Sequence, residues 1–242
     1  MNFDLGGPVF PAAICAVDAG DLPQDEADPA GNRARIFGAV DTILDRGAVP
    51  VLIGGDDSLP IPMLEAFAAR GRVFTVLQID AHIDWRDEVE GERLGFSSAM
   101  RRASEMGHVG AIVQVGQRGT GSARGGDVQD ALERGVAFVP AGEVARLGVG
   151  RAVDLIAVGC DVIICLDLDA LDPSVMPAVM GRTAGGLSYW QVLELIAGVA
   201  EKARIAGVTL VEFAPARDVA GIGATTAAQL LTAILGLLAR QA

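Results

Sequence analysis

Short apolar runs alternate along this chain with longer segments in which apolar residues recur every three or four positions. The short runs are rich in Val, Ile and Leu and are bounded by Gly, Pro or charged residues, which predicts buried strands. These strands are expected at 49–53, 73–79, 111–115, 136–139, 162–166 and 208–211. Helices are expected at 60–70, 97–106, 152–158, 189–203 and 225–238, together with one that carries Ile36, Val40, Ile43 and Leu44 and ends at Gly47.

The alternation of strands and helices predicts an α/β fold. Because each predicted strand is almost entirely apolar, the sheet is expected to be mainly parallel and covered by helices on both faces. The chain shows no internal repeat and no low-complexity linker, so we expect a single domain over residues 1–242. In sheets of this kind, ligands bind beyond the carboxyl ends of the strands.

Composition narrows the function classes. The formal net charge is −12, which disfavours a nucleic-acid partner and suits a cationic substrate, although many acidic proteins are simply highly charged. The three cysteines lie in or beside apolar segments, which is typical of buried thiols in a reducing compartment. The N-terminus lacks the pattern of a signal peptide, and no apolar stretch is long enough to span a membrane. We therefore expect a cytoplasmic protein without a membrane partner.

Two acidic segments each follow a predicted strand. One is Asp80-Ala-His-Ile-Asp84, and the other is Asp167-Leu-Asp-Ala-Leu-Asp172-Pro173. Carboxylates with a single imidazole suit hard or borderline divalent cations such as Mn²⁺ or Mg²⁺. Each segment alone is also explained by helix capping or loop hydrogen bonds. Together, at neighbouring strand ends, they predict a divalent-cation site.

Three further segments carry a resemblance to a known family. They are Gly54-Gly-Asp-Asp-Ser58, Gly185-Gly-Leu187 and Glu212-Phe-Ala-Pro-Ala-Arg-Asp218. With the two acidic segments, they make the chain similar to the ureohydrolases, the arginase and agmatinase family. The resemblance implies a three-layer α/β/α fold of the arginase/deacetylase-like type, a binuclear manganese centre and a homo-oligomer, either a trimer or a hexamer. It also implies hydrolysis of a small cationic guanidino substrate to urea and an amine, by attack of a metal-bound hydroxide.

The resemblance assigns roles to individual residues. It implies that Asp80 and Asp167 bridge the two metals, that Asp84 completes the carboxylates of the first, and that His82 and Asp169 hold the second. It places Glu212 beside the guanidinium, where a carboxylate can accept a bidentate pair of hydrogen bonds. The candidate catalytic residues are therefore Glu212 and Asp84, the candidate substrate-binding residue is Glu212, and the candidate metal ligands are Asp57, Asp80, His82, Asp84, Asp167 and Asp169.

Three departures from the family pattern bear on activity. Asp57 stands where the family has a histidine ligand, which gives a more acidic site that favours harder cations and, being less positive, lowers the pKa of bound water less. An alternative is that Asp57 only caps the following helix. Phe96 stands where active relatives carry a histidine thought to shuttle protons, a task that contributes about 10²–10⁴-fold. The chain also has no equivalent of the family's first strand and helix, so the fold is expected to be N-terminally shortened.

These observations leave two hypotheses. The first is a metal-dependent, agmatinase-like hydrolase with two Mn²⁺ ions, or with Mg²⁺ or another divalent cation. The second, motivated by Asp57, Phe96 and the short N-terminus, is a catalytically impaired or inactive relative that serves as a binding or assembly subunit. Amide deacetylation ranks third, because the paired histidines of deacetylase sites are absent from a chain with two histidines.

Overall fold

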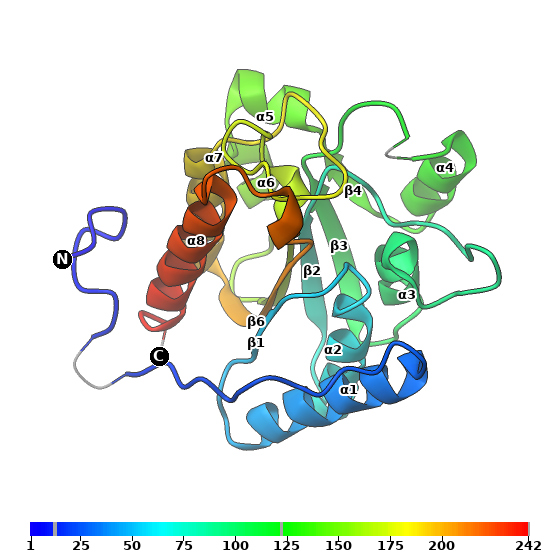
Figure 1. Ribbon diagram of the computed structural model, residues 1–242, viewed down its shortest axis with the longest axis horizontal. Helices are drawn as coiled ribbons and strands as arrows, with labels where there is room; N and C mark the ends of the chain where they lie inside the picture. The colour runs from blue at the N-terminus through cyan, green and yellow to red at the C-terminus, as the bar shows by residue number, and fades with distance from the viewer. Residues whose placement is uncertain (12–13, 122, 242) are drawn as a thin grey trace.

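A single parallel sheet forms the centre of the molecule (Figure 1). The computed structural model describes residues 1–11, 14–121 and 123–241. The strands are β1 (Val51–Ile53), β2 (Phe74–Ile79), β3 (Val109–Val115), β4 (Ala137–Val139), β5 (Asp161–Asp167) and β6 (Arg204–Val211). Their order across the sheet is β1-β6-β5-β2-β3-β4, and every pairing is parallel. The expected α/β fold is confirmed, with the mainly parallel sheet parallel throughout these strands.

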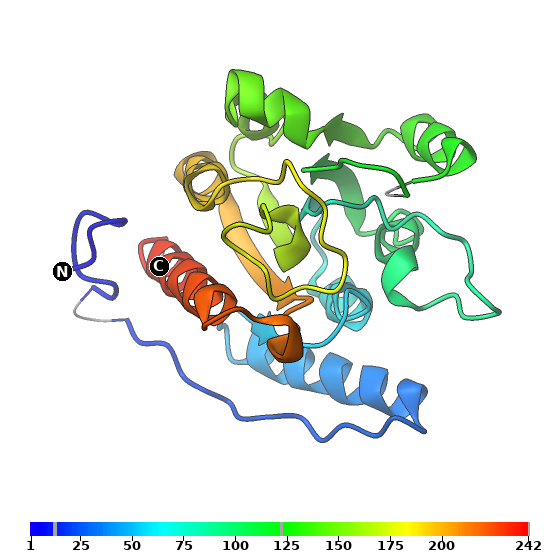
Figure 2. The same cartoon turned by 45° about the horizontal axis from the view of Figure 1, so that its top comes forward.

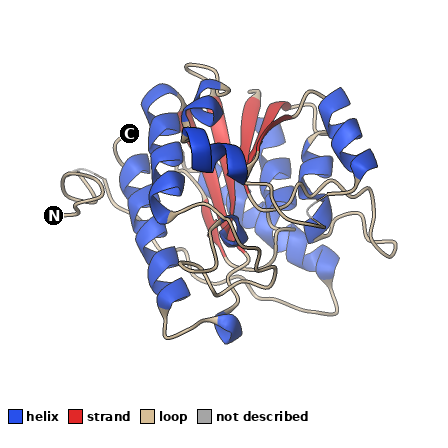
Figure 3. Ribbon diagram, turned by 90° about the horizontal axis from the view of Figure 1, so that it is seen from above, coloured by secondary structure: helices blue, strands red, loops and turns tan. Residues whose placement is uncertain are grey.

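Helices cover both faces of this sheet (Figure 3). They are α1 (Pro29–Asp45), α2 (Pro60–Phe67), α3 (Ala99–Ala103), α4 (Gly125–Glu133), α5 (Ala141–Leu147), α6 (Gly150–Asp154), α7 (Tyr189–Lys202) and α8 (Ile222–Leu238). Helices α1 to α4 pack on one face and α5 to α8 on the other. The resulting three layers place the long helices α1 and α8 on opposite sides of the strands (Figure 2).

The core divides into two clusters because side chains alternate across a strand. In β5, Ile163 and Cys165 point to the cluster beneath α1 to α4, whereas Ile164 and Leu166 point to the cluster beneath α5 to α8. All seven residues of β5 are buried. This double burial explains why the interior strands are recognisable as continuous apolar runs.

Local capping sets the beginnings of two of the longer helices. The side chain of Asp28 accepts a hydrogen bond from the Gly31 N–H at 2.8 Å at the start of α1, where Pro29 supplies a preset φ. At the start of α7, Ser188 and Gln191 form a reciprocal capping box. None of the helices of the described residues is long and apolar enough to cross a membrane.

Several element predictions need correction. The sequence predicts a flexible loop over 119–126, but the end of that segment begins α4, and α5 is not predicted at all. The helices predicted at 97–106 and 152–158 are shorter: α3 has five residues after a 3-10 turn (η2, Phe96–Ser98), and α6 has five residues. The apolar run at 12–17 forms no regular element over 14–17, and residues 12 and 13 lie outside the described residues.

The cysteines agree only in part with the expectation of buried thiols. Cys165 is buried in β5, where burial raises the pKa of its thiol to about 12. Cys160 is partly buried, but Cys15 is exposed. The prediction of burial is therefore wrong for Cys15, because its apolar run forms no strand and does not reach the core.

Candidate metal centre

The acidic side chains lie at the carboxyl ends of four adjacent strands. Asp80 follows β2, Asp167 ends β5, Asp57 follows β1 through two glycines, and Glu212 follows β6. Because β1, β6, β5 and β2 are neighbours and parallel, their ends meet at one edge of the sheet. The predicted convergence of carboxylates at this edge is therefore what the topology produces.

Two groups of possible ligands form at this edge. Asp80, His82 and Asp169 make one group, and Asp57, Asp80 and Asp84 make the other. Within each group the ligand atoms lie within 4.8 Å of one another. His82 Nδ1 is 3.3 Å from Asp80 Oδ1 and 3.1 Å from Asp169 Oδ2. Asp80 belongs to both groups, so it is placed to bridge two cation positions.

Asp167 and Glu212 flank these groups without belonging to either. Asp167 is buried, and its Oδ1 accepts a hydrogen bond from the Asp169 N–H at 2.6 Å. Glu212 is partly exposed, and its Oε1 accepts a hydrogen bond from the Asp57 N–H at 3.1 Å. This bond ties the end of β6 to the loop that carries Asp57. All six predicted metal ligands are thus at one place, while their individual roles stay predictions.

Burial and crowding oppose ionisation of three of the carboxylates. Burial raises the pKa of Asp57 well above its ordinary value, and the charges of Asp80 and Asp167 raise it further. The pKa of Asp84 is raised by burial and then by the charges of Asp80 and Asp57, and that of Asp167 by burial and the charge of Asp80. Buried like charges at this separation are unfavourable, and a bound cation relieves them.

His82 is the counter-charge within the other group. Its hydrogen bonds with Asp169 and Asp80 raise its pKa to about 11. For Asp80, burial acts to raise the pKa, but hydrogen bonding to His82 and Asp84 outweighs it, so the net pKa is lowered. The imidazole therefore occupies, as a cation, the position from which a neutral imidazole would bind a metal.

The donor set fits a pair of divalent cations. Both carboxylate oxygens of Asp57 are buried, and neither has a hydrogen-bond partner among the described residues. An unpaired buried carboxylate is costly unless a cation coordinates it. This makes the alternative interpretation, in which Asp57 only caps α2, incompatible with the structure: the residue before α2 is Leu59, with no side-chain cap. Asp57 instead faces the other carboxylates.

Two residues of the centre have strained backbones. Asp84 and Glu212 have φ of 42° and 64°, in the left-handed region that side chains other than Gly rarely adopt. The Glu212 N–H donates to the Gly55 carbonyl at 2.9 Å, and the Asp84 carbonyl accepts from the Arg101 N–H at 3.1 Å. Such strain persists where surrounding contacts hold it, which is common at functional sites.

Three supporting residues are missed or misjudged by sequence reasoning. Gln78 and Gln114 are buried polar residues in interior strands that hydrogen-bond toward the carboxylates, and their interruption of apolar runs is the available signal. Arg118, expected to build a pocket or a subunit contact, instead donates to the carbonyls of Asp169, Leu171 and Thr183. It clamps the loop that carries Asp169.

Phe96 and Asp172 lie outside the two groups. The Phe96 side chain is 54% exposed at the start of η2, so a proton-carrying residue there would be open to solvent. Asp172 orders its loop as expected: its carboxylate accepts from the N–H groups of Ser174, Gly185 and Gly186.

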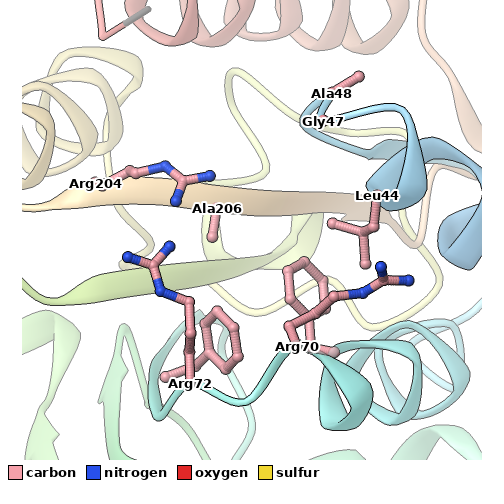
Figure 4. A pocket seen from close by; sticks show the side chains of 9 residues that line it. Leu44, Gly47, Ala48, Arg70, Arg72, Arg204 and Ala206 are labelled. Carbon is pink, nitrogen blue, oxygen red and sulfur yellow. The ribbon is translucent and has the colours of Figure 1, made fainter.

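The hollow shown in Figure 4 is not part of this centre. It has a volume of about 210 Å³ and lies near the starts of β2 and β6, away from the strand ends that carry the carboxylates. Arg70, Arg72 and Arg204 line it, and each is ion-paired: Arg70 with Asp41 and Asp45, and the other two with Asp161. Its guanidinium charges are thus already compensated.

Comparison with known proteins identifies relatives over nearly the whole chain. A family model described as "Arginase family" matches residues 4–236. The N(1)-aminopropylagmatine ureohydrolase of Thermus thermophilus is 36% identical over 192 residues, which are 79% of this chain and 63% of that protein. The agmatinase of Bacillus subtilis is 30% identical over 228 residues, 90% of this chain and 73% of that protein.

Solved structures give the same result at the level of the fold. The proclavaminate amidino hydrolase from Streptomyces clavuligerus matches with a TM-score of 0.83 and 29% identity, covering 93% of this chain and 76% of that one. The chain spans less than two thirds of the length of the Thermus thermophilus protein.

Proposed function

The chain belongs to the arginase family, and on this premise we propose that it is a metal-dependent hydrolase of a guanidino compound, agmatinase-like in releasing urea and an amine. One observation carries the proposal: carboxylates from four adjacent strand ends converge, buried and mutually repelling, around positions that divalent cations would satisfy. The relatives named as an agmatinase and an aminopropylagmatine ureohydrolase support this class of substrate.

Two Mn²⁺ ions are the proposed cofactors, with Mg²⁺ or another divalent cation as the alternative. Asp57, Asp80 and Asp84 would hold one cation, and Asp80, His82 and Asp169 the other, with Asp167 as a further ligand. Aspartate oxygens and one imidazole are ligands that Mn²⁺ accepts. When bound, such a pair supplies Lewis acidity that lowers the pKa of water at the site.

Glu212 is the residue proposed to orient the substrate by binding its guanidinium, because it lies beside the Asp57 loop and is only partly buried. Its Oε1 accepts the Asp57 N–H, so its Oε2 is proposed to accept from the substrate. Burial raises the pKa of Glu212, and a bound guanidinium would counter that by stabilising the carboxylate. The net charge of −12 favours approach of a cation.

The test is a urea assay on metal-loaded protein. Protein reconstituted with Mn²⁺ is incubated with agmatine, aminopropylagmatine, guanidinobutyrate and arginine, and urea is measured over time. We expect urea from at least one guanidino compound, and none from protein treated with EDTA or from Asp80→Asn. If elemental analysis finds both metals bound and no compound yields urea, the hydrolase proposal is wrong.

A second candidate function is that of a metal-binding relative without this catalysis. The exposed Phe96 favours it, because a phenyl ring cannot carry a proton to the leaving amine. The discriminating experiment compares the wild type with Phe96→His and with Phe96→His/Asp57→His. An inactive wild type that binds metal, together with variants that release urea, would support this second function. A wild type that already turns over would exclude it.

A further inference from the structure

Two glutamines are buried at the centre of the sheet, directly beneath the carboxylates. Gln78 lies on β2 and Gln114 on β3, where they are register partners, and both side chains are 0% exposed. Burying an amide costs free energy unless its hydrogen bonds are replaced. Strands in this position otherwise carry apolar residues, so these two amides are expected to do something that an apolar side chain cannot.

The hydrogen bonds of Gln78 lead to two candidate metal ligands. Its Nε2 donates to Asp80 Oδ2 at 2.6 Å and to Asp84 Oδ2 at 2.5 Å. One amide group thus stands between two carboxylates and donates one proton to each. Because a carboxylate accepts and does not donate when ionised, the amide nitrogen must face them, which leaves Gln78 Oε1 facing away.

Gln114 holds Gln78 in that orientation. Its Nε2 donates to Gln78 Oε1 and also to the Ile83 carbonyl at 2.8 Å. The second bond fixes the peptide that precedes Asp84, whose φ of 42° is in the left-handed region. Gln114 therefore acts at two points: it fixes the donor between the carboxylates, and it restrains the turn that directs the Asp84 side chain.

We propose that Gln78, oriented by Gln114, is a positioning residue that sets the cation affinity of the Asp57–Asp80–Asp84 position specifically. This role rests on the proposed metal-dependent function. Gln78 donates to Asp80 and Asp84, whereas His82 and Asp169 take their hydrogen bonds from other groups, so the two cation positions depend on Gln78 unequally. Groups that hold metal ligands in place typically contribute about 10–100-fold to metal affinity.

The experiment separates the two positions by mutation and measures Mn²⁺ binding by titration calorimetry. His82→Ala leaves the Asp57–Asp80–Asp84 position, and Asp57→Asn leaves the Asp80–His82–Asp169 position. Into each background we introduce Gln78→Leu, which has a similar size and no donor. We expect the dissociation constant to rise about 10–100-fold in the His82→Ala background, and to rise clearly less in the Asp57→Asn background. Gln114→Leu should act in the same direction and more weakly.

Controls keep a general loss of stability apart from a loss of positioning. Thr75→Val removes another buried polar group from β2, at the opposite end of the strand, and should leave both dissociation constants unchanged. Unchanged affinity in Gln78→Leu and Gln114→Leu, or equal losses at both positions, would overturn the inference. If Gln78→Leu does not fold, Gln114→Leu decides the question. A wild type that binds no Mn²⁺ would instead refute the proposed function itself.

Discussion

Asp57 holds a buried carboxylate whose oxygens accept no hydrogen bond among the described residues. Its pKa is raised first by burial and then by the charges of Asp80 and Asp167. The folded protein therefore bears an electrostatic cost at this residue in the absence of a cation. Groups that bind a ligand commonly lower the stability of the unliganded fold, because stability and function select different side chains.

Replacing Asp57 with Asn should therefore separate stability from metal binding. Asp57→Asn removes a repelling charge, so in EDTA at pH 8 we expect the melting temperature to rise by a few degrees. In Mn²⁺ the same variant should gain less on metal addition than the wild type, because it has lost a ligand. Differential scanning fluorimetry in both buffers measures both effects.

A matched control is Asp161→Asn at the other end of the sheet. Asp161 is also buried, but it is paired with Arg72 at 3.0 Å. Removing that carboxylate leaves Arg72 without its partner, so the melting temperature of this variant should not rise in EDTA. A rise in both variants would mean that loss of any buried aspartate is stabilising, and that repulsion within the metal centre is not the cause.

At the scale of elements, Arg118 joins three segments that have no backbone pairing with one another at this point. It follows β3, and its guanidinium donates to the carbonyls of Asp169, Leu171 and Thr183 at 2.7, 3.1 and 2.8 Å. A further bond at 3.1 Å reaches Ala170. These carbonyls belong to the 3-10 turn η3 (Leu168–Ala170) and to the following loops, and the planar guanidinium, with its five N–H donors, can reach them together.

Replacing Arg118 should therefore destabilise the protein and weaken metal binding at the Asp169 side. For Arg118→Met we expect a loss of about 2–4 kcal/mol in the free energy of unfolding, because several carbonyls lose their donor. Arg118→Lys should recover part of this loss. Urea denaturation measures it. The control Arg151→Met, at an exposed arginine that bonds Glu143, should lose less than about 1 kcal/mol. Equal losses in the two variants would contradict the role of Arg118.

The elements also show how far the sequence alone can lead. The interior strands are predictable because burial on both faces makes them continuously apolar, as in β5. The exposed helix α4 is not, because only Ala131 of its residues is buried and it has no apolar stripe to reveal it. Likewise, Asp80 and Asp169 are predictable from their place after strands, whereas the roles of Gln78 and Arg118 depend on register and loop path, which the sequence does not display.

For the whole molecule, the acidic centre couples folding to pH and to cations. The pKa values of Asp57, Asp84 and Asp167 are raised by burial and mutual repulsion, and that of His82 is raised to about 11. At pH values above the ordinary carboxyl range, the folded chain therefore holds protons that the unfolded chain releases. Stability must fall as pH rises wherever the unfolded state binds fewer protons.

This linkage gives a prediction for the metal-free protein and its opposite for the loaded one. In EDTA, the melting temperature should fall between pH 5.5 and pH 8, since the stabilising contribution of groups with raised pKa is fully present at low pH and is lost as pH rises. Mn²⁺ binds the deprotonated ligands, so its stabilisation, which grows with the ratio of metal concentration to dissociation constant, should increase over the same range. The difference in melting temperature between Mn²⁺ and EDTA should thus widen with pH, and Asp57→Asn should flatten the EDTA curve. A melting temperature in EDTA that rises from pH 5.5 to pH 8 would show that these carboxylates do not repel one another in the fold, and the cation site inferred from their crowding would lose its basis.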